Sequence, residues 1–411
     1  MNAAPLSPRD QRALVAVAVQ FFVNGAMTAS FIARAPQIRD RIGVSVDQFG
    51  LLITITAVFG MLGSLSAGRI VDTAGTRRVL QAGAVVMVLS LPVIGAAGSP
   101  AMWLVGMFTY TFLDVLVDIS MNLQGSWISA RRHTPVMNRL HGLWSLGTFA
   151  GGIGAVIANA AGLSPFTHLT IVAVAMAAAL AIVTQHLLRV DEDVEAARVP
   201  PPATASRRVR RLPAVLLVLA SMMAVAAEVT GGDWASFRLT DDFGAAGAIG
   251  SLAFVAYTVG MAGMRFGGDW LQARLGRMTL HRLSVTLAAA GLAVASLVPN
   301  EAVAVAGFLL VGVGVATFMP KLYDDAARLP GRRGAGLGAM TAGMRLAFLA
   351  TPVAVGTLAG TRLTVGAAIA IVTLPAIAAL VVVTEYNERL LRRWASAGAG
   401  SADQSESSRS R

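Results

Sequence analysis

Twelve apolar runs, each about as long as a membrane-crossing helix, constrain the fold of this chain more than any other feature of its sequence. A helix of about 20 apolar residues spans the hydrocarbon core of a bilayer. Of the 411 residues, 55% are hydrophobic and only 13% are charged, so a water-soluble fold would lack the polar surface to cover its core. We therefore predict an all-α integral membrane protein with twelve transmembrane helices. The runs cover residues 13–33, 49–67, 79–97, 102–128, 140–162, 166–188, 213–234, 247–267, 279–298, 302–322, 336–359 and 364–384, to within a few residues.

The arginines predict how these helices are oriented. If the N-terminus is inside, the inner connections hold the arginine clusters, and the outer connections hold only Arg34, Arg39, Arg41, Arg238 and Arg362. Cytoplasmic loops of membrane proteins carry such an excess of basic residues. We expect a multi-pass protein of the plasma (inner) membrane with both termini in the cytoplasm. The net charge of +11 then faces anionic lipid, and no nucleic-acid partner is expected.

The longest internal connection divides the chain in two. Residues 189–211 mix charges with three consecutive prolines, a composition typical of a flexible linker. We predict an N-terminal six-helix half over residues 1–188, a cytoplasmic linker over 189–211 and a C-terminal six-helix half over 212–394. Residues 395–411 are rich in small and polar residues and are predicted to be a disordered tail.

A short motif occurs in both halves. The strips 68-GRIVDTAGTRR-78 and 265-RFGGDWLQARLGR-277 each place an aspartate at the exit of a span, followed by glycine and then arginine. Two six-span halves with matching loops are the parallel-repeat architecture of many secondary transporters. We expect these loops to control conformation, because carboxylates stabilise helix N-termini. The residues of the motif are Gly68, Asp72, Gly75, Arg77, Arg78, Asp269 and Gly276.

The first strip resembles the G-x-x-x-D-x-x-G-x-R signature of the major facilitator superfamily. Further segments resemble its rhizopine-transporter-like (MosC-like or YbjJ-like) branch. The resemblance implies a membrane transporter whose central cavity is lined by spans 1, 4, 7 and 10, and it implies no particular cargo. Arg345, Lys321, Asp324 and Asp325 depart from the milder residues expected in spans 10 and 11. The resembling segments are 21-FFVNGAMTASFIARAPQI-38, 118-DISMNLQG-125, 140-LHGLWSLG-147, 228-EVTGGDW-234, 267-GGDWLQARLG-276, Pro320 and 328-RLPG-331.

Ionisable side chains inside the predicted spans are the candidate functional residues, because charge in a membrane interior is costly and usually serves a function. Span 4 carries Asp114, Asp118 and Asn122 at a spacing of i, i+4 and i+8, which places them on one helix face. Asp114 lies nearest the middle of the membrane and is expected to touch the cargo. The substrate and proton-coupling candidates are Asn24, Asp114, Asp118, Asn122, Gln124, Glu228 and Arg345.

Charge pairs between spans are predicted to act as gates. An Asp118–Lys321 contact would close the inner side of the cavity, and Arg34 with Glu228 or Asp233 would close the outer side. The gating candidates are Arg34, Asp233, Lys321 and His141. Structural roles are equally allowed: a hydrogen-bond network between spans 4 and 5 (Asp118, Asn122 and His141), a fixed ion pair of Glu228 and Asp233 with Arg34, and neutralisation of Asp114 or Asp324 by Arg345 instead of cargo anchoring.

Together these features predict a secondary active transporter that works by alternating access and couples a small organic solute to protons. A polar solute such as a sugar, an inositol or an amino-inositol is favoured. Export of drug-like or cationic compounds is one alternative, and a non-transporting receptor or scaffold with the same fold is another. The chain has no G-x-x-x-x-G-K-[ST] loop for ATP, no H-E-x-x-H or other paired-histidine metal spacing and no G-x-S-x-G elbow. We expect no enzymatic activity, no cofactor and no metal site; the partners are the solute, protons and the lipid bilayer, and the chain is expected to be a monomer.

Overall fold

The computed structural model describes residues 7–132, 136–189, 211–328 and 335–409. Within these ranges the chain forms helices and no β-strand. Twelve helical stretches are long and apolar enough to cross a membrane. The predicted all-α fold with twelve spans is therefore confirmed. All but the two end residues of the predicted linker, 189–211, lie outside the described residues.

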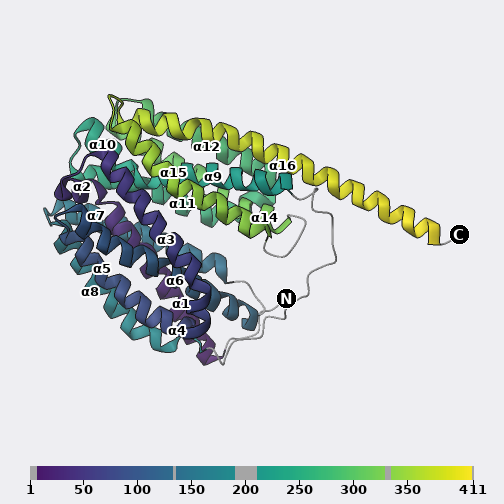
Figure 1. Ribbon diagram of the computed structural model, residues 1–411, viewed down its shortest axis with the longest axis horizontal. Helices are drawn as coiled ribbons and strands as arrows, with labels where there is room; N and C mark the ends of the chain where they lie inside the picture. The colour runs from purple at the N-terminus through teal and green to yellow at the C-terminus, as the bar shows by residue number, and fades with distance from the viewer. Residues whose placement is uncertain (1–6, 133–135, 190–210, 329–334, 410–411) are drawn as a thin grey trace.

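The helices form two groups along the chain, which we call the N half and the C half (Figure 1). The N half contains α1 (Pro8–Ile32), α2 (Ala35–Ile42), α3 (Val46–Ala74), α4 (Thr76–Arg78), the π-helix η1 (Val79–Gly83), α5 (Ala84–Ala96), α6 (Pro100–Arg132), α7 (Met137–Ala160), α8 (Pro165–Val183) and the 3₁₀ turn η2 (Thr184–His186). The C half contains α9 (Arg211–Asp233), α10 (Ala235–Phe243), α11 (Gly247–Leu275), α12 (Arg277–Leu297), α13 (Glu301–Val315), α14 (Phe318–Arg328), α15 (Ala335–Ala359) and α16 (Val365–Arg409).

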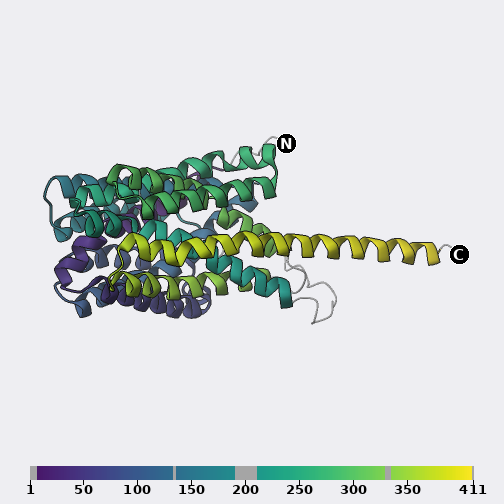
Figure 2. The same ribbon diagram turned by 90° about the horizontal axis from the view of Figure 1, so that it is seen from above.

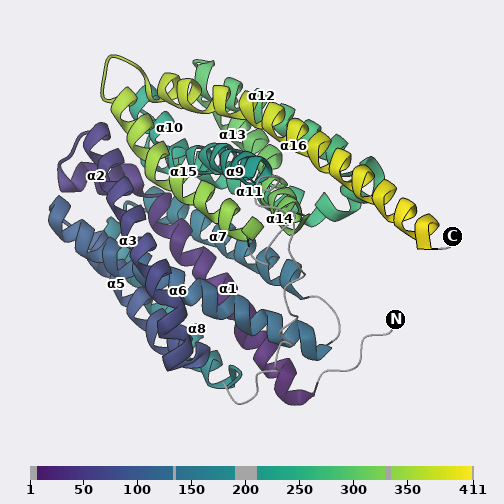
Figure 3. The same ribbon diagram turned by 45° about the vertical axis from the view of Figure 1, so that its right-hand side comes forward.

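α1 begins and α16 ends at the same end of the bundle (Figure 1, Figure 2). We call this end, where α9 also begins, the terminal end. The other end carries the short helices α2 and α10, and we call it the far end. The two halves meet at the far end and diverge toward the terminal end (Figure 1, Figure 3).

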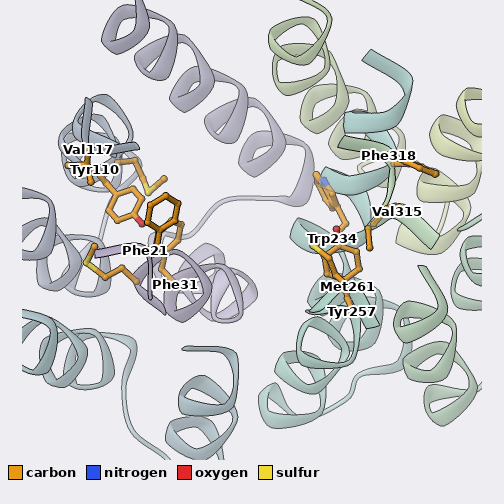
Figure 4. Close-up of a cluster of buried hydrophobic side chains, with 14 of the residues drawn as sticks. Phe21, Phe31, Tyr110, Val117, Trp234, Tyr257, Met261, Val315 and Phe318 are labelled. Atoms are coloured by element: carbon orange, nitrogen blue, oxygen red, sulfur yellow. The ribbon is translucent and has the colours of Figure 1, made fainter. Parts of the chain in front are cut away.

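Both halves contribute aromatic side chains to the buried apolar interior (Figure 4). In the N half, Phe31 of α1 meets Tyr110 of α6 edge to face, with ring centroids 4.9 Å apart. In the C half, Trp234, Tyr257 and Phe318 belong to the buried apolar cluster. Both groups belong to one buried apolar cluster, which crosses between the halves where the rings of Phe49 on α3 and Phe237 on α10 lie 5.5 Å apart.

Glycines allow close contact between helices of one half. A Cβ atom at Gly147 would lie 2.0 Å from the carbonyl oxygen of Phe22, and one at Gly151 would lie 2.2 Å from that of Ala26. Any side chain at these positions would push α7 away from α1, so the absence of a side chain sets the distance between the two helices.

The matching loops of the two halves share a backbone conformation. α3 and α11 both have 29 residues and both end at a glycine, Gly75 at φ 79° and ψ 147° and Gly276 at φ 78° and ψ 155°. This region of φ and ψ is open almost only to glycine. Gly68, Asp72 and Asp269 lie in helices, but their surroundings are not described. The acidic part of the motif therefore stays a prediction.

The C-terminal segment is drawn as part of the last helix, and the predicted disorder of residues 395–411 stays a prediction. α16 continues as helix to Arg409 and projects beyond the rest of the bundle at the terminal end (Figure 2). Extending an existing helix adds one hydrogen bond for each residue that is fixed, and no proline follows Pro375 to stop it.

Candidate functional site

A cavity of about 690 Å³ lies between the two halves, within the size range of small-molecule sites. α1, α2, α3 and α6 line it from the N half, and α9 and α15 line it from the C half. Spans 1, 4 and 7 were expected to contribute. Span 10, which is α13 with α14, contributes none of the described lining residues, and α3 and α15 take its place. These two helices pack closely, since a Cβ atom at Gly50 would lie 2.6 Å from the carbonyl oxygen of Pro352.

The wall of this cavity is mainly apolar and aromatic, with four charged side chains. The charged residues are Asp114 and Asp118 of α6, Asp233 of α9 and Arg345 of α15. Three carboxylates therefore face one guanidinium. The aromatic lining residues are Phe31, Phe49, Trp103, Tyr110 and Phe348.

Asp114 is positioned by Asn24, which is 4% exposed. The Nδ2 of Asn24 donates to Oδ1 of Asp114 at 2.7 Å, and the Oδ1 of Asn24 accepts from Nε1 of Trp144 at 2.8 Å. Asn24 is not a lining residue of the cavity. It acts on the cavity through Asp114, and it joins α6 to α7.

Asp118 lies one helical turn further along α6 and is exposed to the cavity. Asn122 donates to the carboxylate of Asp118 at 3.0 Å and to its backbone carbonyl at 2.8 Å. This contact stays within α6. His141 of α7 meets the ring of Phe21 edge to face at 5.2 Å, so the network predicted between spans 4 and 5 is not formed by these three residues.

Gln124 lies outside the cavity, contrary to its prediction as a substrate or proton-coupling residue. Its side chain is fully buried. The amide donates to Oγ1 of Thr76 and to the carbonyl oxygen of Leu188, each at 2.9 Å, and accepts from the backbone nitrogen of Leu188 at 3.0 Å. Gln124 therefore holds together three segments of the N half near the terminal end, since α6 has turned this residue away from the face that carries Asp118.

Arg345 spans the boundary between the halves. Its Nη2 donates to the hydroxyl of Ser64 on α3, and no ion pair of Arg345 is found among the residues that the structure describes. Pairing of Arg345 with Asp114 is therefore not seen. The side chain of Asp324 lies outside the described residues, so its neutralisation by Arg345 stays a prediction.

Glu228 pairs with a residue other than Arg34. The Nη2 of Arg265 on α11 lies 3.5 Å from Oε1 of Glu228, and its Nη1 donates to Oγ of Ser145 on α7 at 3.2 Å. The guanidinium also faces the ring of Trp144, 5.9 Å from the ring centroid. Glu228 is thus held within the C half, while its partner reaches across to the N half.

Arg34 does not form the predicted outer gate. Its side chain is 2% exposed and donates to the carbonyl oxygen of Leu163 at 2.7 Å, within the N half. Burial lowers the pKa of Arg34 to about 10. Asp233 lines the cavity instead of pairing with it. The turn that follows α7 thus holds this arginine through the carbonyl oxygen of Leu163.

Lys321 does not contact Asp118 in this conformation. Its Nζ lies 2.5 Å from Oδ2 of Asp325, one turn further along α14, and Arg277 of α12 holds the other oxygen of that carboxylate at 2.5 Å. Arg277 also pairs with Glu388 of α16. Lys321 is thus part of an ion-pair cluster inside the C half, away from the cavity.

The halves are joined at the far end by residues that the sequence did not single out as a pair. Arg39 of α2 forms an ion pair with Asp241 of α10, and its guanidinium lies over the ring of Phe237 at 5.3 Å. Beside them, Asn159 donates to Oγ of Ser251 at 2.7 Å, and that hydroxyl donates to the carbonyl oxygen of Ala33 at 2.8 Å.

The basic residues of the first loop motif lie at the terminal end. Arg77 donates to the carbonyl oxygen of Gln185 at 2.9 Å, which ties the loop to the end of α8 and η2. Arg78 is exposed. This placement is compatible with the predicted control of conformation by the loop. Neither arginine lies in the cavity.

Arg265 is the functional candidate that the sequence reasoning missed. It lies within the predicted span 247–267, so a charge inside a span was the signal that could have identified it. Arg39 and Asp241 carried no such signal, because both lie in predicted loops and are 202 residues apart.

Comparison with known proteins is consistent with this geometry. Residues 17–352 match the sequence profile of the Major Facilitator Superfamily. The protein named "Uncharacterized transporter y4wD" of Sinorhizobium fredii is 27% identical over 318 residues, which cover 76% of this chain and 81% of that protein. "Membrane protein MosC" of Rhizobium meliloti is 26% identical over 336 residues, covering 80% of this chain and 79% of that protein.

Solved structures share the architecture at low sequence identity. The nucleoside transporter NupG superposes with a TM-score of 0.66 at 12% identity, over 93% of this chain and 99% of that one. A bacterial homologue of the human lysosomal transporter Spinster, solved in an inward-facing and unoccupied conformation, gives a TM-score of 0.63 at 14% identity, over 94% of this chain and 97% of that one. At such identities the similarity describes the fold.

Proposed function

Because this chain belongs to the Major Facilitator Superfamily, we propose that it moves a small organic solute by alternating access and couples that movement to protons. The observation that carries the proposal is the charged cavity of about 690 Å³ between the two halves. The halves are bridged at the far end and diverge toward the terminal end (Figure 3). A site between two such bodies can be exposed to one side of the membrane at a time.

The Arg39–Asp241 pair is the proposed far-end gate, in place of a pair formed by Arg34. It joins α2 of the N half to α10 of the C half, so the far end cannot open until this pair separates. The distribution of arginines supports assigning the far end to the outside of the cell. In this assignment the conformation is open to the cytoplasm, and Lys321 is kept away from Asp118.

The carboxylates of the cavity are the proposed proton carriers. Asp114 and Asp118 accept hydrogen bonds from Asn24 and Asn122, which carry no charge. Chains of carboxyl groups inside membrane proteins commonly serve as proton relays. Asp114 is proposed to bind both the proton and the cargo, and Asp118, exposed to the cavity, to pass the proton on.

A polar cargo such as a sugar, an inositol or an amino-inositol remains the favoured class. Carboxylates accept hydrogen bonds from hydroxyl groups, and Arg345 can donate to them. A cationic or drug-like compound is the second candidate. It is favoured by the excess of three carboxylates over one guanidinium and by the aromatic wall, since aromatic faces attract organic cations.

A thermal-shift screen of the purified protein tests the proposal and separates the two cargo classes. A ligand present at a hundredfold excess over its Kd stabilises the fold by about 2.7 kcal/mol. We expect stabilisation by a polyol or an amino-inositol, lost in Asp114→Asn and kept in Glu301→Gln, a carboxylate on α13 outside the cavity. Stabilisation by lipophilic cations alone would support the second class. If no compound of either class stabilises the protein, the proposed cargoes are wrong.

A further inference from the structure

A continuous series of side-chain contacts leads from the cavity to Glu228, which does not line it. Asp114 accepts from Asn24 at 2.7 Å, and Asn24 accepts from Trp144 at 2.8 Å. The ring of Trp144 faces the guanidinium of Arg265 at 5.9 Å, and Arg265 lies 3.5 Å from Glu228. The series runs through α6, α1, α7, α11 and α9, and it crosses from the N half to the C half between Trp144 and Arg265.

Arg265 is shared between the halves. Its partners on α7 are Ser145, at 3.2 Å, and the ring of Trp144, whereas its carboxylate partner, Glu228, belongs to the C half. The side chains of Arg265 and Glu228 are 23% and 25% exposed, so the pair is not sealed inside the protein. A movement of α7 relative to α11 therefore changes the contacts that support this guanidinium beside Glu228.

Trp144 has two contacts that can be separated chemically. Its indole N–H holds the amide of Asn24, and its ring face supports Arg265. The amide of Asn24 is in turn fixed by the carboxylate of Asp114. Protonation turns that carboxylate into an uncharged and weaker acceptor, and a cargo group that binds its Oδ1 competes with the amide. Either change weakens the constraint on the indole.

We propose that Trp144 and Arg265 couple the cargo cavity to a second protonation site, Glu228. The inference rests on the proposed function and deepens it. While Arg265 is held between α7 and Glu228, the Glu228 carboxylate keeps its charge partner. Release of Arg265 leaves a carboxylate that can accept a proton. By thermodynamic reciprocity, occupancy of Glu228 then alters the energetics of Asp114 by the same factor. Trp144 and Arg265 are positioning residues in this scheme.

The neighbours of Glu228 are compatible with a titrating group. Arg265 and Tyr257 of α11 and Tyr323 of α14 lie within electrostatic range of its carboxylate. Tyr257 also donates to the backbone carbonyl of Glu228 at 3.0 Å. Asp233 shares α9 and lies within range of Tyr257. On the side of the N half, His141 lies within range of Arg265, and Asp118 within range of Tyr323.

A distance measurement across the far end can test this coupling without a known cargo. The chain has no cysteine, so spin labels can be placed at Arg41→Cys and Ala246→Cys, two exposed positions on opposite halves. Pulsed electron paramagnetic resonance on the purified full chain then gives the fraction of molecules with an open far end, with protons as the only ligand.

The measurement is a double-mutant cycle of Asp114→Asn and Glu228→Gln, repeated in the Trp144→Phe background. Phenylalanine keeps an aromatic face for Arg265 and lacks the N–H donor. With Trp144 present, we expect the two substitutions to change the open-to-closed ratio non-additively, by about fivefold or more. In the Trp144→Phe background we expect additivity. Trp127→Phe, on α6, is the matched control and should leave the non-additivity unchanged.

Each outcome bears on a different claim. Additivity with Trp144 present would overturn the coupling of Asp114 and Glu228. Non-additivity that persists in Trp144→Phe would overturn the route through Trp144. A distance that changes with neither pH nor any substitution would contradict alternating access itself, and with it both proposals.

Discussion

The polar side chains of α6 have different roles according to the neighbour that each one meets. Asp114 meets the amide of Asn24, Asp118 faces the cavity, and Gln124 is buried against Leu188. All three looked alike in the sequence as polar groups in an apolar helix. Only the first two can contact a cargo, because Gln124 has its hydrogen-bond partners within the N half.

Gln124→Leu is therefore expected to lower stability and to leave ligand binding intact. The substitution leaves the backbone N–H and C=O of Leu188 without this partner. A buried polar group left without a partner costs about 1–3 kcal/mol. Thermal unfolding of the purified protein should show a clearly lower unfolding temperature for Gln124→Leu. Gln185→Leu, at an exposed position, should leave the unfolding temperature almost unchanged. If the unfolding temperature of Gln124→Leu is unchanged and stabilisation by the ligand is lost, Gln124 is instead part of the binding site.

α7 is the element that links the fold to the proposed coupling. It packs on α1 without side chains at Gly147 and Gly151, and it presents Trp144 and Ser145 to Arg265 of α11. The distance between α1 and α7 therefore also sets the geometry of the Asn24–Trp144 hydrogen bond. Packing and function depend here on the same two helices.

Gly151→Ala is expected to destabilise the protein, whereas Gly154→Ala on the same helix is expected to be neutral or stabilising. A Cβ atom at Gly151 would lie 2.2 Å from the carbonyl oxygen of Ala26, while one at Gly154 meets only Nε2 of His168 at 3.8 Å. Alanine at an uncrowded helix position is favoured over glycine by about 0.5–1 kcal/mol. Thermal unfolding of the two variants measures the contrast, and equal behaviour would mean that α1 and α7 are not in close contact.

At the scale of the whole molecule, the two halves meet through apolar contacts, such as Phe49 with Phe237, and through polar contacts. The Arg39–Asp241 pair and the Arg345–Ser64 contact both cross the boundary. Polar contacts of this kind can break and form again at small cost in free energy. The proposed alternating access would separate the halves at these contacts.

Asp241→Asn is expected to favour opening of the far end. An ion pair of partly exposed side chains contributes up to about 1 kcal/mol, or about a fivefold change in the open-to-closed ratio. Asp40→Asn is the matched control, because Asp40 binds the same arginine from within the N half and is 64% exposed. The distance between labels at Arg41→Cys and Ala246→Cys should lengthen in Asp241→Asn only. The same response in both variants would exclude a gate at this pair.

The orientation in the membrane can be checked with single cysteines in this cysteine-free chain. Ala161→Cys lies in the α7–α8 turn at the far end, and Thr73→Cys lies near the end of α3 at the terminal end; both positions are exposed. In intact cells a membrane-impermeant maleimide should label Ala161→Cys and leave Thr73→Cys unlabelled until the cells are opened. The reverse pattern would place both termini outside.

The sequence by itself determined the twelve spans and the presence of carboxylates and arginines inside them. Both follow from local properties, namely the length of an apolar run and the cost of charge in lipid. The glycines that end α3 and α11 could also be read locally, because few other residues adopt their backbone conformation.

Only the tertiary structure decided which of these groups meet. Arg34 binds Leu163 and not Glu228, Lys321 binds Asp325 and not Asp118, and Gln124 faces away from the cavity. Helical periodicity tells which residues share a face, but not which distant helix that face meets or at what height. The helix that each face meets depends on how closely glycines allow two helices to approach and on the angle between the halves. Neither quantity can be inferred from a local stretch of sequence.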